Sequence, residues 1–318
     1  MHGSPEIVPL AAGAARATIV VGRGGACASA VLESPQGPRD VLWAPADFTG
    51  PTGRPSGGGI PILCPFPGRL PTTTIDFGGR VWSLPPGDAL GRPIHGLVHD
   101  RPWRVVERDA ARLVIAFRLS ADAPDALHRW PADFSLTATW SLGPGRLEVA
   151  LDLLAHGTMP AALGLHPYHP VPVVPGADPR DAAIEVPAAL WQPQERLLPV
   201  GVPRPAEERR RDDGSPIGLP GAAAWEGLVL DDPFCGLAPD ALGRVVARVV
   251  DRAGGAAIRA EWDPVFSACV IFTPPHRQAV CIEPCSTLPG RGDFAAAAGW
   301  RVLADGERLT ARYAVAAV

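Results

Sequence analysis

Proline and glycine are the residues that most restrict the secondary structure of this chain. Of its 318 residues, 38 are proline and 35 are glycine. Proline interrupts a helix interior and glycine weakens it, so long helices are disfavoured. Hydrophobic residues nevertheless make up 47% of the chain, which is enough to bury a large core and excludes wholesale disorder. Many short strands joined by turns satisfy both conditions.

Hydrophobic and polar residues alternate in several short segments. In residues 134–140, apolar side chains share one face of an extended chain and hydroxyl side chains share the other. A Gly-Pro-Gly turn connects this segment to residues 146–154, which alternate in the same way, and this arrangement predicts a hairpin. Further strands are predicted within residues 16–33 (two strands around a turn), 113–119, 242–250, 255–262, 267–273, 278–283 and 309–316.

The rest of the chain is predicted to be mostly loops and turns. Residues 34–60 and 203–220 are rich in turn-forming or charged residues, and 293–300 is one of the few segments that could form a helix. Similar strand patterns lie on both sides of the charged loop, so it does not separate two domains. We therefore expect residues 1–318 to form a single all-β domain, a large antiparallel β-sandwich with few short helices.

Charge and cysteine content exclude several classes of protein. The net charge is −4 and there is no basic block, so we expect no nucleic-acid partner. No run of about 18 apolar residues predicts a membrane span, and the N-terminus does not resemble a secretory signal. The six cysteines lack paired zinc-type spacing and are expected to be free thiols, which favours a cytoplasmic protein.

Two rigid segments carry candidate functional residues. Residues 59–70 contain three closely spaced prolines and include Arg69, whose guanidinium either lines a pocket or lies on the surface. In the extended segment that follows Leu165, His166 and Tyr168 share a face and His169 takes the other. A histidine beside an aromatic ring could contact a sugar, but it could also be a core residue.

Glu283 is the candidate general base. It follows the apolar residues 279–282 and precedes Pro284, which we expect to stop the strand. A carboxylate at the mouth of a buried strand is partly desolvated, which raises its pKa toward neutrality. The alternative is an exposed glutamate at a strand end.

His95 and His99 raise the alternative of a metal site. Nearby prolines and Gly96 make a helix unlikely at this position. On a strand the two rings would be about 13 Å apart, too far to share an ion. We therefore predict no metal at these histidines.

These residues occur in an order that resembles the aldose 1-epimerase (galactose mutarotase) family. The resemblance rests on the proline-rich segment that ends in an arginine, a His-Gly element, Gly-x-His-Pro-Tyr, a strand that ends in an aspartate and a phenylalanine, and Glu-Pro. In this chain they lie at residues 59–70, 93–96, 164–168, 229–234 and 272–284. The matching region extends from about residue 18 to 315.

The resemblance implies an isomerase that interconverts the α and β anomers of a free hexose. Glu283 is implied as the general base, His166 as the general acid, and His95 as a supporting hydrogen-bond partner. Arg69 and Asp231 are implied to hold sugar hydroxyls, and Tyr168 or Trp103 to supply an aromatic wall. The reaction needs no metal or other cofactor, and the partner is a small sugar. A monomer or homodimer is expected.

The chain also departs from the family pattern. Gly68, Leu97, His169 and Cys285 replace residues that are commonly asparagine, glycine or aromatic, phenylalanine and aromatic, respectively. Two alternatives therefore stay open. One is an enzyme for a hexose 6-phosphate or another modified sugar, with Arg92, Arg101 and Arg277 as candidate extra cations. The other is a carbohydrate-binding protein without catalysis.

Overall fold

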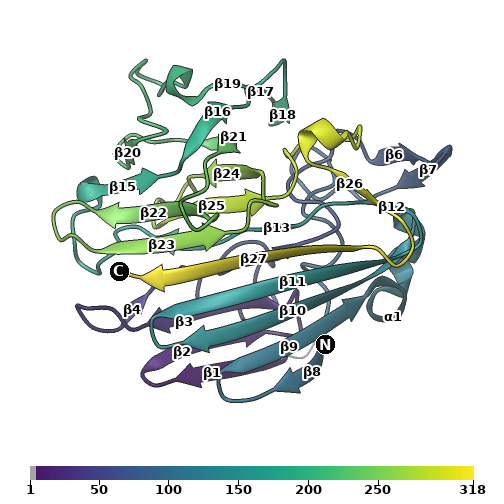
Figure 1. Cartoon of the computed structure of the whole chain (residues 1–318), viewed down its shortest axis with the longest axis horizontal. Helices are drawn as coiled ribbons and strands as arrows, with labels where there is room; N and C mark the ends of the chain where they lie inside the picture. The colour runs from purple at the N-terminus through teal and green to yellow at the C-terminus, as the bar shows by residue number, and fades with distance from the viewer. Residues whose placement is uncertain (1–4) are drawn as a thin grey trace.

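Antiparallel strands form most of the ordered structure in the computed structural model, which describes residues 5–318 (Figure 1). The helical elements are one four-residue α-helix and four short 3₁₀ turns. The expected all-β class with few short helices is therefore confirmed. The absence of a signal sequence was predicted from the N-terminus, whose residues 1–4 lie outside the described residues.

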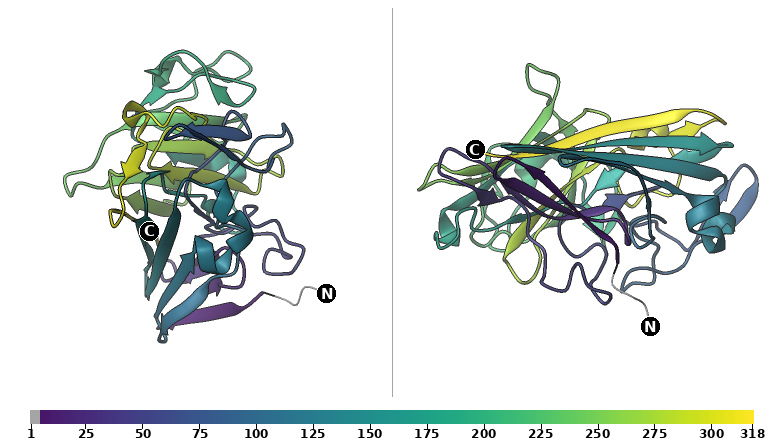
Figure 2. Two further views of the ribbon diagram at one scale, coloured as in Figure 1. Left: turned by 90° about the vertical axis from the view of Figure 1, so that its right-hand side faces the viewer. Right: turned by 90° about the horizontal axis from the view of Figure 1, so that it is seen from below.

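The largest layer is a nine-stranded antiparallel sheet. It faces the viewer in Figure 1 and forms the upper edge of the right-hand view in Figure 2. In spatial order its strands are β20 (Ala222–Ala224), β15 (Ala182–Glu185), β22 (Val245–Asp251), β23 (Ala257–Trp262), β27 (Arg308–Ala317), β11 (Arg146–His156), β10 (Asp133–Gly143), β9 (Arg112–Arg118) and β8 (Arg104–Arg108).

The hairpin β10–β11 shows why the alternating pattern specifies this sheet. Its eleven-residue strands pair from Asp133↔His156 to Gly143↔Arg146, and every second side chain is buried. The apolar face packs inward and the polar face remains partly exposed, as the period-two pattern predicts. The predicted hairpin is confirmed, and the other predicted strands also form.

Behind this layer lies an eight-stranded sheet that carries the candidate site. Its path is β19 (Arg204–Pro205), β16 (Ala188–Trp191), β21 (Asp231–Leu237), β24 (Ala268–Phe272), β25 (Ala279–Cys285), β13 (Gly164–Leu165) and β5 (Ile62–Leu63), and β14 (Tyr168–Pro170) also pairs with β25. Trp140 of β10 and Ile282 of β25 belong to the same buried core cluster. The two sheets therefore share a core, as a sandwich requires.

The remaining strands form small sheets at the periphery. The four-stranded sheet contains β1 (Ile7–Ala12), β2 (Ala15–Val20), β3 (Ala26–Leu32) and β4 (Arg39–Asp40). The two-stranded sheets are β6 (Thr74–Phe77) with β7 (Arg80–Ser83), β12 (Met159–Ala161) with β26 (Arg301–Leu303), and β17 (Gln194–Glu195) with β18 (Leu198–Pro199).

The helical segments are short. They are α1 (Leu119–Asp122), η1 (Pro124–Arg129), η2 (Pro179–Asp181), η3 (Ala206–Glu208) and η4 (Ala296–Ala298). Of the possible helix at 293–300, only the single turn η4 forms. Among the described residues, no helix has both the length and the apolar character that crossing a bilayer requires.

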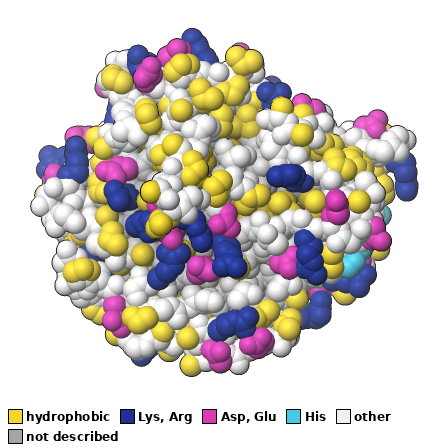
Figure 3. All heavy atoms as spheres, viewed as in Figure 1, with side chains coloured by type: hydrophobic (Ala, Val, Ile, Leu, Met, Phe, Trp, Pro, Cys, Tyr) yellow, Lys and Arg dark blue, Asp and Glu magenta, His cyan; other side chains and the backbone are white. Residues whose placement is uncertain are grey.

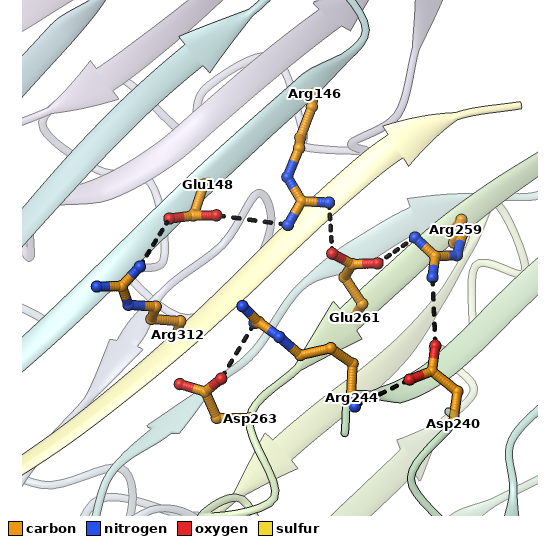
Figure 4. A network of polar contacts seen from close by, with 8 residues as sticks. All are labelled: Arg146, Glu148, Asp240, Arg244, Arg259, Glu261, Asp263 and Arg312. Atoms are coloured by element: carbon orange, nitrogen blue, oxygen red, sulfur yellow. Dashed lines mark hydrogen bonds and ion pairs between the residues drawn. The ribbon is translucent and has the colours of Figure 1, made fainter. Parts of the chain in front are cut away.

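The face of the nine-stranded sheet that points away from the core carries a network of ion pairs (Figure 4). Glu261 pairs with both Arg146 and Arg259, and Glu148 pairs with Arg146 and Arg312. Positive and negative side chains are interspersed over this side of the molecule (Figure 3). Because charged residues alternate with buried apolar ones along each strand, the network keeps this face of the sheet polar.

Candidate active site

Strand β25 places Glu283 at the centre of the eight-stranded sheet. All seven residues of the strand are buried, and Glu283 lies opposite Val270 of β24. The residue is 4% exposed. The expectation that Glu283 ends the strand was wrong, because β25 continues through Pro284 to Cys285. The carboxylate is therefore more completely desolvated than the sequence indicates.

His166 lies between β13 and β14, directly beside Glu283. Its Nε2 atom is 3.2 Å from Oε1 of Glu283, although the two residues are far apart in the sequence. The backbone N–H of His166 donates to the carbonyl of Pro61, and its ring stacks on Tyr168 with centroids 4.8 Å apart. The candidate base and the candidate acid therefore lie side by side in one pocket.

His95 approaches His166 from a third segment. The two ring centroids are 5.2 Å apart and nearly perpendicular. His95 has a φ of 64° and Gly96 a φ of 80°, so this stretch turns sharply instead of extending. The expected separation of about 13 Å between His95 and His99 was wrong for this reason, since their ring centroids are 6.1 Å apart.

Gly96 is required at this turn. A Cβ atom there would lie 2.0 Å from the carbonyl oxygen of Cys64, which is an impossible contact. Its positive φ is also one that side chains rarely adopt. The close passage of the two backbones is what carries His95 into the pocket.

Arg69 and Asp231 form the polar side of the pocket. One NH2 group of Arg69 is 3.6 Å from the Asp231 carboxylate, and Nε of Arg69 donates to Asp88 at 3.0 Å. Asp231 is the first residue of β21, whereas the sequence pattern suggested that it lies near the end of a strand. Asp88 was missed, because nothing in its surrounding sequence marks it as a partner of a distant arginine.

Tyr168 lines the pocket with its ring and holds it in place with its hydroxyl. The hydroxyl donates to the carbonyl of Ser56 at 2.8 Å. Its neighbour His169 points to the opposite side of the strand, as predicted. Trp103 does not contribute a wall, because it is buried against Phe117 and its indole N–H donates to the carbonyl of Val98.

These side chains line one cavity. Its empty volume of about 650 Å³ includes the open space at its mouth. Sequence reasoning missed Arg54, Gln194 and Phe272, which also line it. Arg54 and Gln194 lie in irregular or very short segments, where no period identifies which side chains turn inward.

Burial and nearby charges change the protonation of the acid–base pair. Burial, with a smaller contribution from Asp231, raises the pKa of Glu283 well above its usual range, and Arg69 partly opposes this shift. Burial lowers the pKa of His166 to about 3. Burial and the neighbouring His166 lower the pKa of His95 well below its usual range. Both shifts favour the uncharged forms, a protonated Glu283 and a neutral His166, which together hold one proton.

The pocket also contains one group of potential metal ligands among the described residues. His166, Cys281 and Glu283 place their ligating atoms within 4.8 Å of one another. All three are buried. Neither His95 nor His99 belongs to this group.

The sequence matches the profile of the family described as aldose 1-epimerase over residues 6–316. The chain belongs to the aldose 1-epimerase family. No curated protein sequence is similar enough to this chain to count as a match. The family assignment nevertheless covers nearly the whole chain, and the resemblance seen in its motifs is confirmed.

Solved structures show the same fold at low sequence identity. A galactose mutarotase-like protein from Clostridium acetobutylicum has a TM-score of 0.82 at 18% identity, covering 98% of this chain and 95% of that one. The aldose epimerase homologue from C. elegans has a TM-score of 0.79 at 15% identity, covering 98% of each chain. The galactose 1-epimerase of Lactobacillus acidophilus has a TM-score of 0.70 at 15% identity, again covering 98% of each. The galactose mutarotase-like sandwich is thereby confirmed.

Proposed function

We propose that this protein interconverts the α and β anomers of a free hexose by acid–base ring opening and closure. The observation that supports this proposal is the 3.2 Å approach of His166 Nε2 to Glu283 Oε1 inside this pocket. Arg69, Asp231 and Tyr168 line the same pocket and supply donors, acceptors and an apolar face for a hydroxyl-rich ring.

Ring opening requires the single proton of the pair to lie on His166. Arg69 favours the ionised form of Glu283, so transfer of the proton across the 3.2 Å contact yields a carboxylate and an imidazolium. The carboxylate takes the proton of the anomeric hydroxyl while the imidazolium protonates the ring oxygen. The C1–O bond of the ring breaks and a free aldehyde forms.

Ring closure reverses these proton movements. After opening, the proton is on Glu283 and His166 is neutral, which is the protonation that the pocket itself favours. Rotation about the C1–C2 bond exposes the other face of the aldehyde. Attack by the hydroxyl then forms the other anomer, with His166 accepting a proton and Glu283 returning one. His95 is proposed to hydrogen-bond near the ring oxygen.

Polarimetry tests this proposal. Fresh α-glucose or α-galactose should equilibrate faster with the wild-type protein than without it, and Glu283→Gln should lose at least about 100-fold in rate. Glu226→Gln, which changes an exposed glutamate, is the matched control. Sugar binding without catalysed anomerisation would instead establish a carbohydrate-binding protein.

A sugar with an anionic substituent is the second candidate substrate. Arg54 lines the pocket, and within residues 5–318 its side chain has no hydrogen-bond or ion-pair partner. The three arginines expected for this role do not line the pocket. Arg92 and Arg277 bind backbone carbonyls, and Arg101 pairs with Asp125. Competition between glucose and glucose 6-phosphate, in wild type and Arg54→Gln, distinguishes the two substrates.

We place this activity in the cytoplasm. All six cysteines are free in the structure, and free thiols are typical of a reducing compartment. We also propose that the whole chain acts as a single domain.

A further inference from the structure

Cys281 is a buried thiol that the proposed proton transfer does not use. It lies two residues before Glu283 on β25, so both side chains project to the same face of the strand. Its register partners are Tyr168 of β14 and Phe272 of β24. Cys281 is therefore held directly beneath the acid–base pair by strands on both sides.

The spacing of His166, Cys281 and Glu283 is close to that of metal ligands. Their ligating atoms all lie within 4.8 Å of one another, and the His166–Glu283 pair is at 3.2 Å. In a tetrahedral zinc site with bonds of about 2.0–2.3 Å, neighbouring ligand atoms are roughly 3.3–3.8 Å apart. Contractions of about 1 Å or less would bring the three groups onto one ion.

The combination of ligand types selects the metal. One imidazole nitrogen, one sulfur and one carboxylate oxygen suit Zn²⁺ and its substitute Co²⁺. Mg²⁺ and Ca²⁺ prefer oxygen ligands and are poorly matched by this set. His166 and Glu283 also line the sugar pocket, which leaves a fourth position open toward it.

We propose that His166, Cys281 and Glu283 form a zinc site. While zinc is bound the protein cannot turn over sugar, and while sugar is bound the site cannot hold zinc. The ion replaces the thiol proton of Cys281 and the carboxyl proton of Glu283, and both protons go to solvent. Neutral His166 donates its ring lone pair. The metal site stands on the geometry alone, whereas its inhibitory effect rests on the proposed epimerase function.

Titration of the metal-free protein with Co²⁺ tests the site directly. We expect one equivalent to bind with a thiolate-to-cobalt absorption band, which Zn²⁺ then displaces. Cys281→Ser should abolish the band and weaken the binding of Zn²⁺ at least tenfold, since even the loss of an outer-shell partner costs about 10–100-fold. Cys235→Ser, which changes a partly exposed thiol of β21 outside the pocket, should keep the band.

Several results would overturn the site. These are the absence of a thiolate band in the wild type, its persistence in Cys281→Ser, or its loss in Cys235→Ser. If Cys281→Ser does not fold, competition in the wild type decides, because a saturating sugar should lower the apparent affinity for Co²⁺. Unchanged affinity for Co²⁺ with the sugar bound would refute mutual exclusion.

Activity measurements separate this proposal from the proposed function. We expect Zn²⁺ to inhibit anomerisation and the half-inhibitory concentration to rise at least tenfold in Cys281→Ser. A cobalt band without any epimerase activity would leave the metal site standing and refute the function. Activity that is insensitive to Zn²⁺, with no cobalt band, would refute the metal site and leave the function standing.

Discussion

The carboxylate of Asp88 accepts a hydrogen bond from Nε of Arg69 at 3.0 Å while it also accepts from the backbone N–H groups of Leu90 and Arg92. Burial opposes ionisation of Asp88, but these backbone contacts and Arg69 together lower its pKa. One charged side chain thus fixes a loop and orients the guanidinium that faces Asp231. Asp88 is therefore a positioning residue for the proposed sugar pocket.

Replacing Asp88 should weaken sugar binding more than it slows the chemical step. We expect Asp88→Ala to raise KM about tenfold with a smaller change in kcat. Asp88→Asn should raise KM less, because the amide oxygen still accepts a hydrogen bond from Nε of Arg69. Steady-state polarimetry measures both constants. Asp125→Asn, which breaks the exposed pair with Arg101, is the control, and equal effects in the two asparagine variants would contradict the assigned role.

Asp231 should set the alkaline limb of the pH–rate profile. Its negative charge helps to raise the pKa of Glu283, and the proposed mechanism needs the one proton that Glu283 and His166 share, so activity falls as the pH rises through that pKa. The limb should therefore lie above the ordinary pKa of a glutamate. Asp231→Asn removes the repulsion between the two carboxylates and should move the midpoint of this limb to lower pH, even if the rates are smaller. Asp263→Asn, on the remote ionic face, should leave the midpoint in place.

His169 should make the folded state sensitive to acid. Burial lowers the pKa of His169 to about 4, while its Nδ1–H donates to Val41 and Tyr313 donates to its Nε2. Because the pKa is lowered on folding, the stabilisation is present above pH 6.5 and is lost as the pH falls toward 4. A single such proton accounts for up to roughly 3 kcal/mol over this range.

His169→Phe, which restores the residue common in the family, removes this dependence. We expect it to cost about 1–3 kcal/mol at pH 7, because the carbonyl of Val41 and the hydroxyl of Tyr313 lose their partner. Its free energy of unfolding should then fall less between pH 7 and pH 5 than that of the wild type. Urea titrations at both pH values measure this difference, and His128→Gln, an exposed histidine, serves as the control.

Glycine stands at position 68 for a steric reason that the sequence could not reveal. Its φ is 61°, and a Cβ atom would lie 2.6 Å from the Cβ of Pro289. Gly68→Asn, which restores the common family residue, should therefore destabilise the protein by about 1–3 kcal/mol. Adding Pro289→Gly, which removes this Cβ atom, should recover part of this loss. Thermal unfolding of the single and double variants checks the coupling, and strictly additive losses would refute it.

Glu261 should contribute more to stability than an ordinary surface charge. It bridges Arg146 and Arg259, and its side chain is only 9% exposed. We expect Glu261→Gln to lower the free energy of unfolding by about 1 kcal/mol, an effect that decreases at high salt. Glu185→Gln, which breaks a single exposed pair with Arg248, should change it by a few tenths of a kcal/mol.

The sequence predicted the fold class because burial follows the period of the strands. Residues 134–140 and 146–154 form β10 and β11 because their apolar side chains must face the core. Peripheral strands such as β8, all five of whose residues are exposed, have no such alternation and were missed. Short pairings such as β13 with β5 depend on partners far along the chain, which no local pattern specifies.

The candidate site was predicted in part for similar reasons. Family motifs identified His95, His166, Arg69 and Glu283, and the structure brings their side chains to one pocket. Arg54, which lines the pocket, and Asp88, which contacts Arg69, lie outside those motifs and are placed by loop conformation. The positive φ of His95 likewise depends on the backbone packing around Gly96, so its proximity to His99 could not be read from spacing.

The pairing of β25 with β13 and β14 joins segments that lie far apart along the chain. A protein of such high contact order must lose the entropy of closing long loops before these pairs form and contribute favourable free energy, which slows folding. Early intermediates made of local hairpins such as β10–β11 would lack the assembled pocket. Activity should therefore return later during refolding than β-structure does. The rate at which activity returns would then measure the formation of the last long-range strand pairing.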